Sequence, residues 1–419
     1  MTKHASITVF LAGLLLAAAL PATAGSAASA VASPQSPTAG FCPPLPPPTG
    51  PTVTVATETE LRDQAYNAAA GTTIWITPGV YDMQSYVHVV NDGVALRGQS
   101  GDRDDVALDF GGMVGGQFGI LVEADDVTIA DLTIRNANDH GVSIQGRDRP
   151  VLYNLHVVDI GDQLIKVNPS GSEDGLLACS RLEYTTTAPD EYTNGISAHD
   201  AHRWVVRDNQ WYRIRTPGDA AVSTILFWSG STDTVVERNL LVDCYQGIAF
   251  GNASHGPGDH SGGVVRNNIV YASLPHDTVI EMVHADGWLV AHNTALLLDP
   301  APGLWWGMEA RYADSQGNFA YNLTNLEIWA DRDGASGTLT GNVTDAQSAW
   351  FVDAAGGDLH LTPLATAAID QAAALPQVPD DYDGDARPIG PAPDVGADEY
   401  GTPPAYDHYL YLPLVIKTW

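Results

Sequence analysis

The chain has 419 residues, with 50 Asp or Glu against 19 Lys or Arg, and so a formal net charge of −31. Such an acidic chain is poorly suited to bind nucleic acid or an anionic membrane surface, and we expect neither partner. Hydrophobic residues make up 44% of the chain, enough for a core, while 41 Gly and 27 Pro indicate many turns rather than long helices. These numbers favour a secreted or surface all-β protein.

Residues 1–30 have the pattern of a secretory signal peptide. A short basic start with Lys3 precedes the apolar run Ile7–Leu20, and small residues follow it. The run is shorter than the ~20 residues that a membrane span requires, so we expect no transmembrane span once the signal is removed. The predicted location is secreted, extracellular or at the surface of a bacterial cell.

Residues 31–52 are rich in Pro, Ala and Ser and are predicted to form a stiff linker. Residues 401–419 form an apolar tail, for which a docked strand and a surface-sorting signal are both open interpretations. The chain has three cysteines, too few for a disulfide scaffold or a Cys-rich zinc site. We expect Cys179 and Cys244 to be free buried thiols.

An internal repeat determines the predicted fold. A short apolar stretch ending in Asn recurs at spacings of 30, 29, 25, 29 and 20 residues, at Asn209, Asn239, Asn268, Asn293, Asn322 and Asn342. A period of this length with strands of a few residues predicts an all-β parallel β-solenoid. Asn tolerates left-handed backbone geometry, and its amide can hydrogen-bond to the Asn of the next coil, so we assign these residues a structural role.

The segment Thr57–Ala70 is the one convincing amphipathic helix, placed where a solenoid needs an N-terminal cap. Together with GTTIWITPGVY after it, the coils and the Asn repeat, it resembles the right-handed parallel β-helix proteins of the pectate-lyase-like superfamily. The resemblance covers residues 53–400, including the closing segment Asp380–Tyr400. It implies a right-handed parallel β-helix with a short capping helix and a polysaccharide as substrate or ligand. We expect the protein to be a monomer.

In enzymes that the chain resembles, the substrate groove follows one exposed sheet. Alternation of side chains along the second strand of each repeat predicts an outward-facing set: Ser143, Gln145, Lys166, Asn168, Ser197, His199, Ala249, Glu281, Glu309 and Arg311. For the strand that contains Trp228, either Leu226 and Trp228 or Phe227 faces outward. Shifting the pairing by one residue would invert any of these assignments.

The first candidate cluster consists of Lys166, Asn168, His199, Asp200 and Trp228, of which Asn168, Asp200 and Trp228 are predicted to bind substrate. Long turns lie near it, and Tyr192, Trp204, Trp211 and Tyr212 are predicted to supply aromatic faces. β-Elimination from a uronic acid needs a cation, Arg or Ca²⁺, to neutralise the carboxylate, and a base to remove the neighbouring proton. We assign these catalytic roles to Lys166, His199 and Arg215. The alternative is a surface lysine beside Asp162 or Asp200.

The second candidate cluster is Glu281, Glu309 and Arg311 on consecutive coils. Two neighbouring carboxylates suit a retaining glycosidase, a Ca²⁺ site or a structural acidic ladder that Arg311 relieves. Since coils repeat about every 4.8 Å, Glu281 lies roughly 19 Å from Lys166, too far for one reaction centre. We therefore expect Glu281, Glu309 and Arg311 to bind substrate if Lys166 is catalytic.

Other metal signals are weaker. Asp381, Asp383 and Asp385 could hold Ca²⁺, although an acidic capping turn is the preferred interpretation. His140 and the other turn histidines show no metal-ligand spacing. The metal ligands therefore stay unassigned, with Ca²⁺ as the one cofactor considered.

Three functions remain open at the level of sequence. The favoured one is a secreted polysaccharide lyase that cleaves an acidic glycan by β-elimination. The second is a glycoside hydrolase or epimerase that uses Glu281 and Glu309. The third is a non-catalytic, glycan-binding or adhesive surface solenoid, because this fold carries many unrelated functions.

Overall fold

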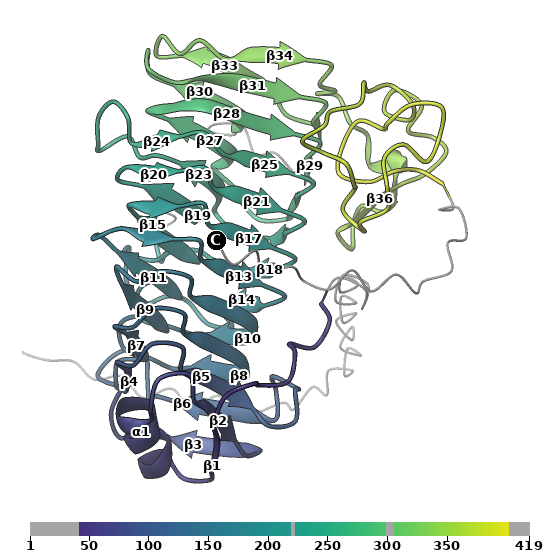
Figure 1. Cartoon of the computed structure of the whole chain (residues 1–419). Coiled ribbons are helices and arrows are strands. Elements are labelled where there is room, and N and C mark those ends of the chain that lie inside the picture. The colour runs from purple at the N-terminus through teal and green to yellow at the C-terminus, as the bar shows by residue number, and fades with distance from the viewer. Residues whose placement is uncertain (1–41, 219–222, 299–305, 402–419) are drawn as a thin grey trace, which may run out of the picture. The chain divides into compact units, whose positions relative to one another are not determined.

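The computed structural model describes residues 42–218, 223–298 and 306–401. The predicted signal peptide, the first half of the linker and nearly all of the C-terminal tail lie outside these residues. Within them, the chain winds into a parallel β-solenoid, with one α-helix at the N-terminal end (Figure 1). The predicted all-β solenoid with a short cap is confirmed.

Each coil contributes one strand to a ten-stranded parallel sheet, here called the front sheet. Its strands in spatial order are β4 (Val87–Val89), β7 (Ile120–Val122), β9 (Val142–Gln145), β11 (Ile165–Asn168), β15 (Ile196–His199), β19 (Ser223–Trp228), β23 (Gln246–Phe250), β27 (Thr278–Val283), β30 (Trp306–Arg311) and β33 (Ile328–Arg332). Neighbours in this order are successive coils, about 4.8 Å apart.

A 24-stranded sheet forms the remaining sides of the coils. Its strands in chain order are β1 (Thr52–Val55), β2 (Thr73–Ile76), β3 (Gly79–Asp82), β5 (Ala95–Gly98), β6 (Val106–Asp109), β8 (Thr128–Arg135), β10 (Val151–Val158), β12 (Ser172–Glu173), β13 (Leu176–Ala178), β14 (Arg181–Glu183), β16 (Ala201–His202), β17 (Val205–Arg207), β18 (Gln210–Tyr212), β20 (Ser231–Thr232), β21 (Val235–Glu237), β22 (Leu240–Val242), β24 (His260–Ser261), β25 (Val264–Arg266), β26 (Ile269–Ala272), β28 (Ala285–Ala291), β29 (Thr294–Leu297), β31 (Gln316–Ala320), β32 (Leu323–Thr324) and β34 (Thr338–Thr340).

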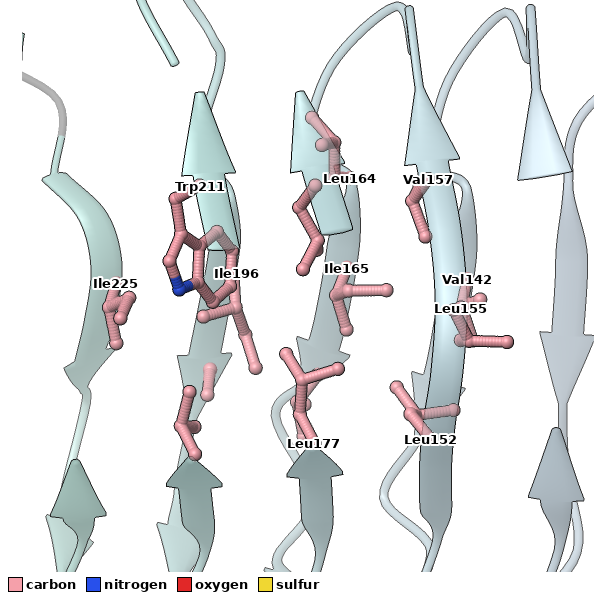
Figure 2. Close-up of a cluster of buried hydrophobic side chains, with 14 of the residues drawn as sticks. Val142, Leu152, Leu155, Val157, Leu164, Ile165, Leu177, Ile196, Trp211 and Ile225 are labelled. Atoms are coloured by element: carbon pink, nitrogen blue, oxygen red, sulfur yellow. The ribbon is translucent and has the colours of Figure 1, made fainter. Parts of the chain in front are cut away.

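Stacked apolar side chains fill the inside of the coils. Ile165, Ile196 and Ile225 pair in register on successive strands of the front sheet, and all three are fully buried (Figure 2). Trp211 occupies the same interior, in register with the buried Leu182 of the preceding coil. Parallel stacking therefore gives each inward position a buried neighbour above and below.

Two of the aromatic residues expected to face the site are part of this core. Trp204 and Trp211 are both 0% exposed, so the prediction that they offer aromatic faces to a ligand is wrong. Trp204 packs over Gly175 of the preceding coil, where a larger residue would clash with the indole. Tyr212 is half-buried and stacks with Arg181 on a different side of the coil.

The repeated asparagines form a buried ladder. Each side-chain amide donates to the side-chain oxygen of the ladder residue in the next coil, for example from Asn239 Nδ2 to Asn268 Oδ1 at 3.0 Å. Each such buried bond stabilises the fold by about 1 kcal/mol. The residue in the left-handed region is the one before the ladder Asn, for instance Asp208 (φ 57°) and Arg238 (φ 49°). The structural role is thus confirmed, whereas the left-handed position is shifted by one residue.

The capping helix α1 (Glu58–Asn67) begins one residue later and ends three residues earlier than predicted. The Thr57 hydroxyl accepts the backbone N–H of Glu60 and so caps the first turn. Leu61 and Ala65 are fully buried against the first coils, where α1 contacts β2 and β4. The helix therefore covers the apolar end of the solenoid.

A disulfide joins Cys42 to Cys179, with 5.6 Å between their Cα atoms. The prediction of a free thiol at Cys179 is therefore wrong, while Cys244 is free and buried as expected. The described part of the predicted linker does not stand free. Pro43 and Pro46 accept hydrogen bonds from Tyr153 and Arg97 of the solenoid, which brings Cys42 to the coil of Cys179.

The C-terminal segment, yellow in Figure 1, packs on the flank of the solenoid. It contains a short 3₁₀ helix, η1 (Ser348–Trp350), and an antiparallel hairpin of β35 (Phe351–Asp353) and β36 (Asp358–Leu361). The Asp381 carboxylate accepts backbone N–H groups of Asp385 and Glu399, as expected for an acidic capping turn. Among the described residues, no helix has the length and apolar character needed to cross a membrane.

Candidate functional site

Alternation along the front sheet is as predicted. Lys166 stands between the inward Ile165 and Val167, and it pairs in register with Ser143 and Ser197 of the adjacent coils. On β19, Phe227 is fully buried in the core, so Leu226 and Trp228 face outward. The register thus settles the one strand that the sequence left open.

The Lys166 amine faces outward, yet Lys166 as a whole is only 4% exposed. Its Nζ lies 2.9 Å from His199 Nε2, 3.3 Å from the Tyr192 hydroxyl and 3.4 Å from the Ser197 hydroxyl. Tyr192 comes from the long turn before β15 and also places its ring 5.6 Å from Nζ. The interpretation of Lys166 as an ordinary surface lysine is therefore wrong.

Burial changes the charge of both basic groups. It lowers the pKa of Lys166 to about 8, although the carboxyl groups of Asp162 and Asp139 act in the opposite direction. Burial, with the nearby Lys166 charge, lowers the pKa of His199 to about 4. His199 is thus neutral at pH 7, and its Nε2 accepts a hydrogen bond from the ammonium group.

An acidic cluster that sequence reasoning missed lies beside Lys166. The possible ligand atoms of Asp139, His140 and Asp162 lie within 4.8 Å of one another. Burial, followed by the hydrogen bond with Asp139, raises the pKa of Asp162 to about 7. His140 shows no metal-ligand spacing in the sequence, but the fold brings it beside two carboxyl groups.

A signal for this cluster was present in the sequence. Asp139 and Asp162 each stand three residues before an inward residue, Val142 and Ile165, that pair in register. Equal offsets from paired residues place the two side chains one coil apart on the same edge of the sheet. The backbone N–H of Asp162 indeed donates to the Asp139 carbonyl at 2.9 Å.

The other residues of the first predicted cluster surround Lys166 to different degrees. The Trp228 ring lies between the tilted rings of His199 and His255, with ring centroids at 4.3 and 4.5 Å. Asn168 Nδ2 donates to the Ser143 hydroxyl one coil earlier. Asp200 follows β15 in a turn, and its carboxylate pairs with His202.

Arg215 is oriented towards later coils. Its guanidinium stacks over Tyr245 and donates to the carbonyl of Pro275, at 2.6 Å. Tyr245 precedes β23 and Pro275 precedes β27, whereas Lys166 lies on β11. These contacts direct Arg215 away from the Lys166 amine.

The second predicted cluster is assembled as expected. Glu281 and Glu309 pair in register on β27 and β30. Glu281 accepts hydrogen bonds from Gln246 at 3.0 Å and from Arg311 at 3.3 Å, while Arg332 of the next coil pairs with Glu309. Burial and the adjacent Glu309 raise the pKa of Glu281 to about 7, so the pair shares one proton near neutral pH.

A cavity of about 350 Å³ connects the two regions of the front sheet. It begins at Tyr192 and Ser197, both in contact with the Lys166 amine, passes Trp228 and ends at Arg332. Four coil steps separate β11 from β27, which places Lys166 and Glu281 roughly 19 Å apart. The two clusters therefore border one groove without sharing a reaction centre.

Comparison with known proteins bears on the fold. Residues 118–294 match the family model described as a right handed beta helix region. Among solved structures, the chain is similar to a pectate lyase, Pel9A (TM-score 0.52, 12% identity, 80% of this chain and 90% of that chain). It is also similar to a rhamnogalacturonan lyase (TM-score 0.50, 11% identity, 75% of this chain and 97% of that chain).

No curated protein matches the sequence at a significant level. At 11–12% identity, the structural matches establish the fold alone. The parallel coils, the Asn ladder and the family match agree with one another. The chain has a right-handed parallel β-helix fold, which it shares with these pectate lyase and rhamnogalacturonan lyase structures.

Proposed function

We propose that this protein is a secreted polysaccharide lyase that cleaves an acidic glycan by β-elimination, with Lys166 as the base. The observation that carries the proposal is the buried amine of Lys166, whose neighbours within 3.4 Å are the uncharged Ser197, Tyr192 and His199. A lysine can act as a base only when its amine is neutral, and its pKa of about 8 makes a neutral form accessible near physiological pH.

The reaction uses groups already in place. The neutral Lys166 amine takes the proton from the carbon beside the sugar carboxylate, and the electron pair of that C–H bond forms a C=C bond as the glycosidic C–O bond breaks. The departing oxygen needs a proton. The Tyr192 hydroxyl stands 3.3 Å from Nζ, and burial raises its pKa, so it remains protonated and able to donate.

A cation is needed to neutralise the carboxylate of the sugar. Asp139 and Asp162 fit calcium, because their carboxyl groups offer oxygen ligands within 4.8 Å of each other, and a bound cation would displace the proton that burial and Asp139 keep on Asp162. Calcium bound there would supply the positive charge that makes the adjacent C–H acidic. We give this role to the acidic pair rather than to Arg215, which stacks over Tyr245.

Glu281, Glu309 and Arg311 are proposed to bind sugar residues further along the groove. The glycosidase alternative needs carboxyl groups about 5 Å apart or more, with the sugar between them. Glu281 and Glu309 instead hydrogen-bond to each other, and each is also paired with an arginine. This arrangement favours a binding role over hydrolysis.

Two further observations support a secreted carbohydrate-active protein. Two solved structures similar to the chain are named as a pectate lyase and a rhamnogalacturonan lyase, so we propose a polysaccharide as the ligand. The Cys42–Cys179 disulfide suits an oxidising environment, in agreement with the predicted signal peptide.

The test is absorbance of the unsaturated uronate product on pectate, alginate and glycosaminoglycans, with and without calcium. We expect product from at least one glycan, at a rate that rises with pH towards about 8. The Lys166→Ala variant should form product at least about 100-fold more slowly while keeping the circular dichroism of the wild type. Binding of a glycan without product in the wild type would instead support the non-catalytic alternative.

A further inference from the structure

A row of aromatic side chains lies on the N-terminal coils, on the side of Lys166 away from the cavity. It consists of Tyr66 on α1, Tyr86 before β4, His88 on β4, Phe118 before β7 and His140 before β9. Neighbouring ring centroids are 5.5 Å apart for Tyr66–His88, 5.7 Å for Tyr86–His88, 6.4 Å for Tyr86–Phe118 and 5.7 Å for Phe118–His140. We call this set the aromatic row.

The two tyrosines of the row are open to solvent although their rings are large and mostly apolar. Tyr66 is 52% exposed and Tyr86 is 41% exposed, while Phe118 is half-buried. The rings meet one another at tilted or edge-on angles, so these contacts leave ring faces uncovered. Contiguous exposed aromatic surface on a soluble protein commonly marks a binding site.

Beside the aromatic row, a line of paired residues on the front sheet runs to Lys166, the proposed base. His88, Leu121 and Ser143 pair in register on β4, β7 and β9, and Ser143 pairs in turn with Lys166. His140, the last member of the row, belongs to the Asp139–His140–Asp162 cluster. The aromatic row is therefore continuous with the Lys166 site and lies across it from the cavity that ends at Arg332.

The shape of the row favours a linear ligand. The coils supply its rings one after another along the solenoid axis, which makes a narrow strip rather than a broad patch. Sugar rings present flat C–H faces that pack on aromatic rings while their hydroxyl groups stay in water, as the amphipathic character of Tyr also allows. A chain lying along this strip would pass straight over Lys166.

We infer that the aromatic row binds sugar residues of the same acidic glycan on the N-terminal side of Lys166, so that the bound chain extends past the base in both directions. This inference rests on the proposed function. A glycan held on both sides of the base is cut within the chain, so the first products are long oligosaccharides rather than single terminal units.

Binding is measured separately from cleavage. Isothermal titration with tetra- to octasaccharides of pectate, alginate and glycosaminoglycans uses the Lys166→Ala variant, in which cleavage is slowed at least about 100-fold. Adding Tyr86→Ala and Phe118→Ala to that variant should weaken binding of the longer oligosaccharides about tenfold or more and leave the shortest less affected. Tyr400, 39% exposed in the C-terminal segment, supplies the matched control, and Tyr400→Ala should change nothing.

Unchanged affinity after loss of Tyr86 and Phe118 would overturn the inference, provided that thermal unfolding shows both variants to be folded. So would an equal loss in the Tyr400→Ala control. If the double substitution instead converts a dimer into a monomer in sedimentation, with affinity unchanged, the row is an interface between copies of this chain. A wild type that binds through the row but forms no product refutes only the proposed lyase activity.

Discussion

The front sheet carries two clusters of ionisable side chains, four coils apart, that border the same cavity. The two clusters differ in the groups that surround their ionisable side chains. Around Lys166, the groups within 3.4 Å of the amine are uncharged. Around Glu281 and Glu309, each carboxyl group has a guanidinium partner, Arg311 for the first and Arg332 for the second. One cluster contains an amine without a hydrogen-bonded carboxylate, and the other contains paired charges.

This difference separates chemistry from binding. A buried lysine that is not paired with a carboxylate loses its proton more easily, which is what a base requires. Each carboxyl group of the second cluster is held in a fixed orientation by its arginine partner, which suits recognition of hydroxyl groups and maintenance of the fold. Judged by the closeness of acidic residues alone, Glu281 and Glu309 would be the favoured catalytic groups. The surroundings of each group favour Lys166 instead.

The largest expected effect is on the chemical step. Lys166→Ala should lower kcat by about 10²- to 10⁴-fold, because the base is removed. The matched change in the other cluster, Glu281→Gln, keeps the shape and the hydrogen bonds of a protonated carboxyl group, so it should raise KM and leave kcat nearly unchanged. Steady-state rates on the glycan that gives product would show this split. A fall in kcat for Glu281→Gln equal to that for Lys166→Ala would contradict the division of roles.

The second largest expected effect is on calcium affinity. Asp162→Asn removes one carboxylate of the proposed cation site and is expected to weaken calcium binding about 10- to 100-fold, measured by calorimetric titration. Asp174→Asn is a suitable control, since Asp174 is an exposed aspartate paired with Arg203 on a neighbouring coil. Calcium affinity that is the same in the wild type and in Asp162→Asn would place the cation elsewhere.

Stability should respond in the opposite sense at the two sites. Glu309 is 1% exposed and paired with Arg332, so Glu309→Ala should lower the free energy of unfolding by about 1–3 kcal/mol. Lys166→Met replaces a buried amine with an apolar side chain of similar length, which should change stability little or raise it. Urea unfolding with an unchanged m-value would test both, and a larger loss for Lys166→Met would show that its amine is structurally required.

The sequence was sufficient for the fold and for part of the site. Asn239 and Asn268 predict stacked coils, because their buried amides must pair with each other. The outward position of Lys166 follows from the alternation of side chains along its strand. Whether Leu226 and Trp228 or Phe227 faced outward could not be decided, since all four residues Ile225–Trp228 are large and hydrophobic. The register with the neighbouring coil resolves it.

Other features depend on contacts between distant parts of the chain. The Cys42–Cys179 disulfide spans 137 residues and forms because a Pro-rich segment packs on the coils, which composition alone does not predict. The cluster of Asp139 with Asp162 was not predicted because both residues lie in turns rather than in strands. Their equal offsets from paired residues nevertheless imply that they stack. Turn positions therefore need the same comparison between coils as strand positions.

The smallest expected effects come from pH, and they have opposite signs in the two clusters. The folded state lowers the pKa of Lys166 from 10.5 to about 8, so the unfolded chain binds more protons between these values and stability should rise from pH 8 to 10.5. The folded state raises the pKa of Glu281 from 4.5 to about 7, so stability should fall as pH rises from 4.5 to 7. Lys166→Met should remove the alkaline rise alone, and Glu281→Gln should remove the acidic fall alone. The free energy of unfolding, measured across both pH ranges, tests this contrast. If one substitution removed the pH dependence in both ranges, the two slopes would not belong to separate clusters, and the contrast would be rejected.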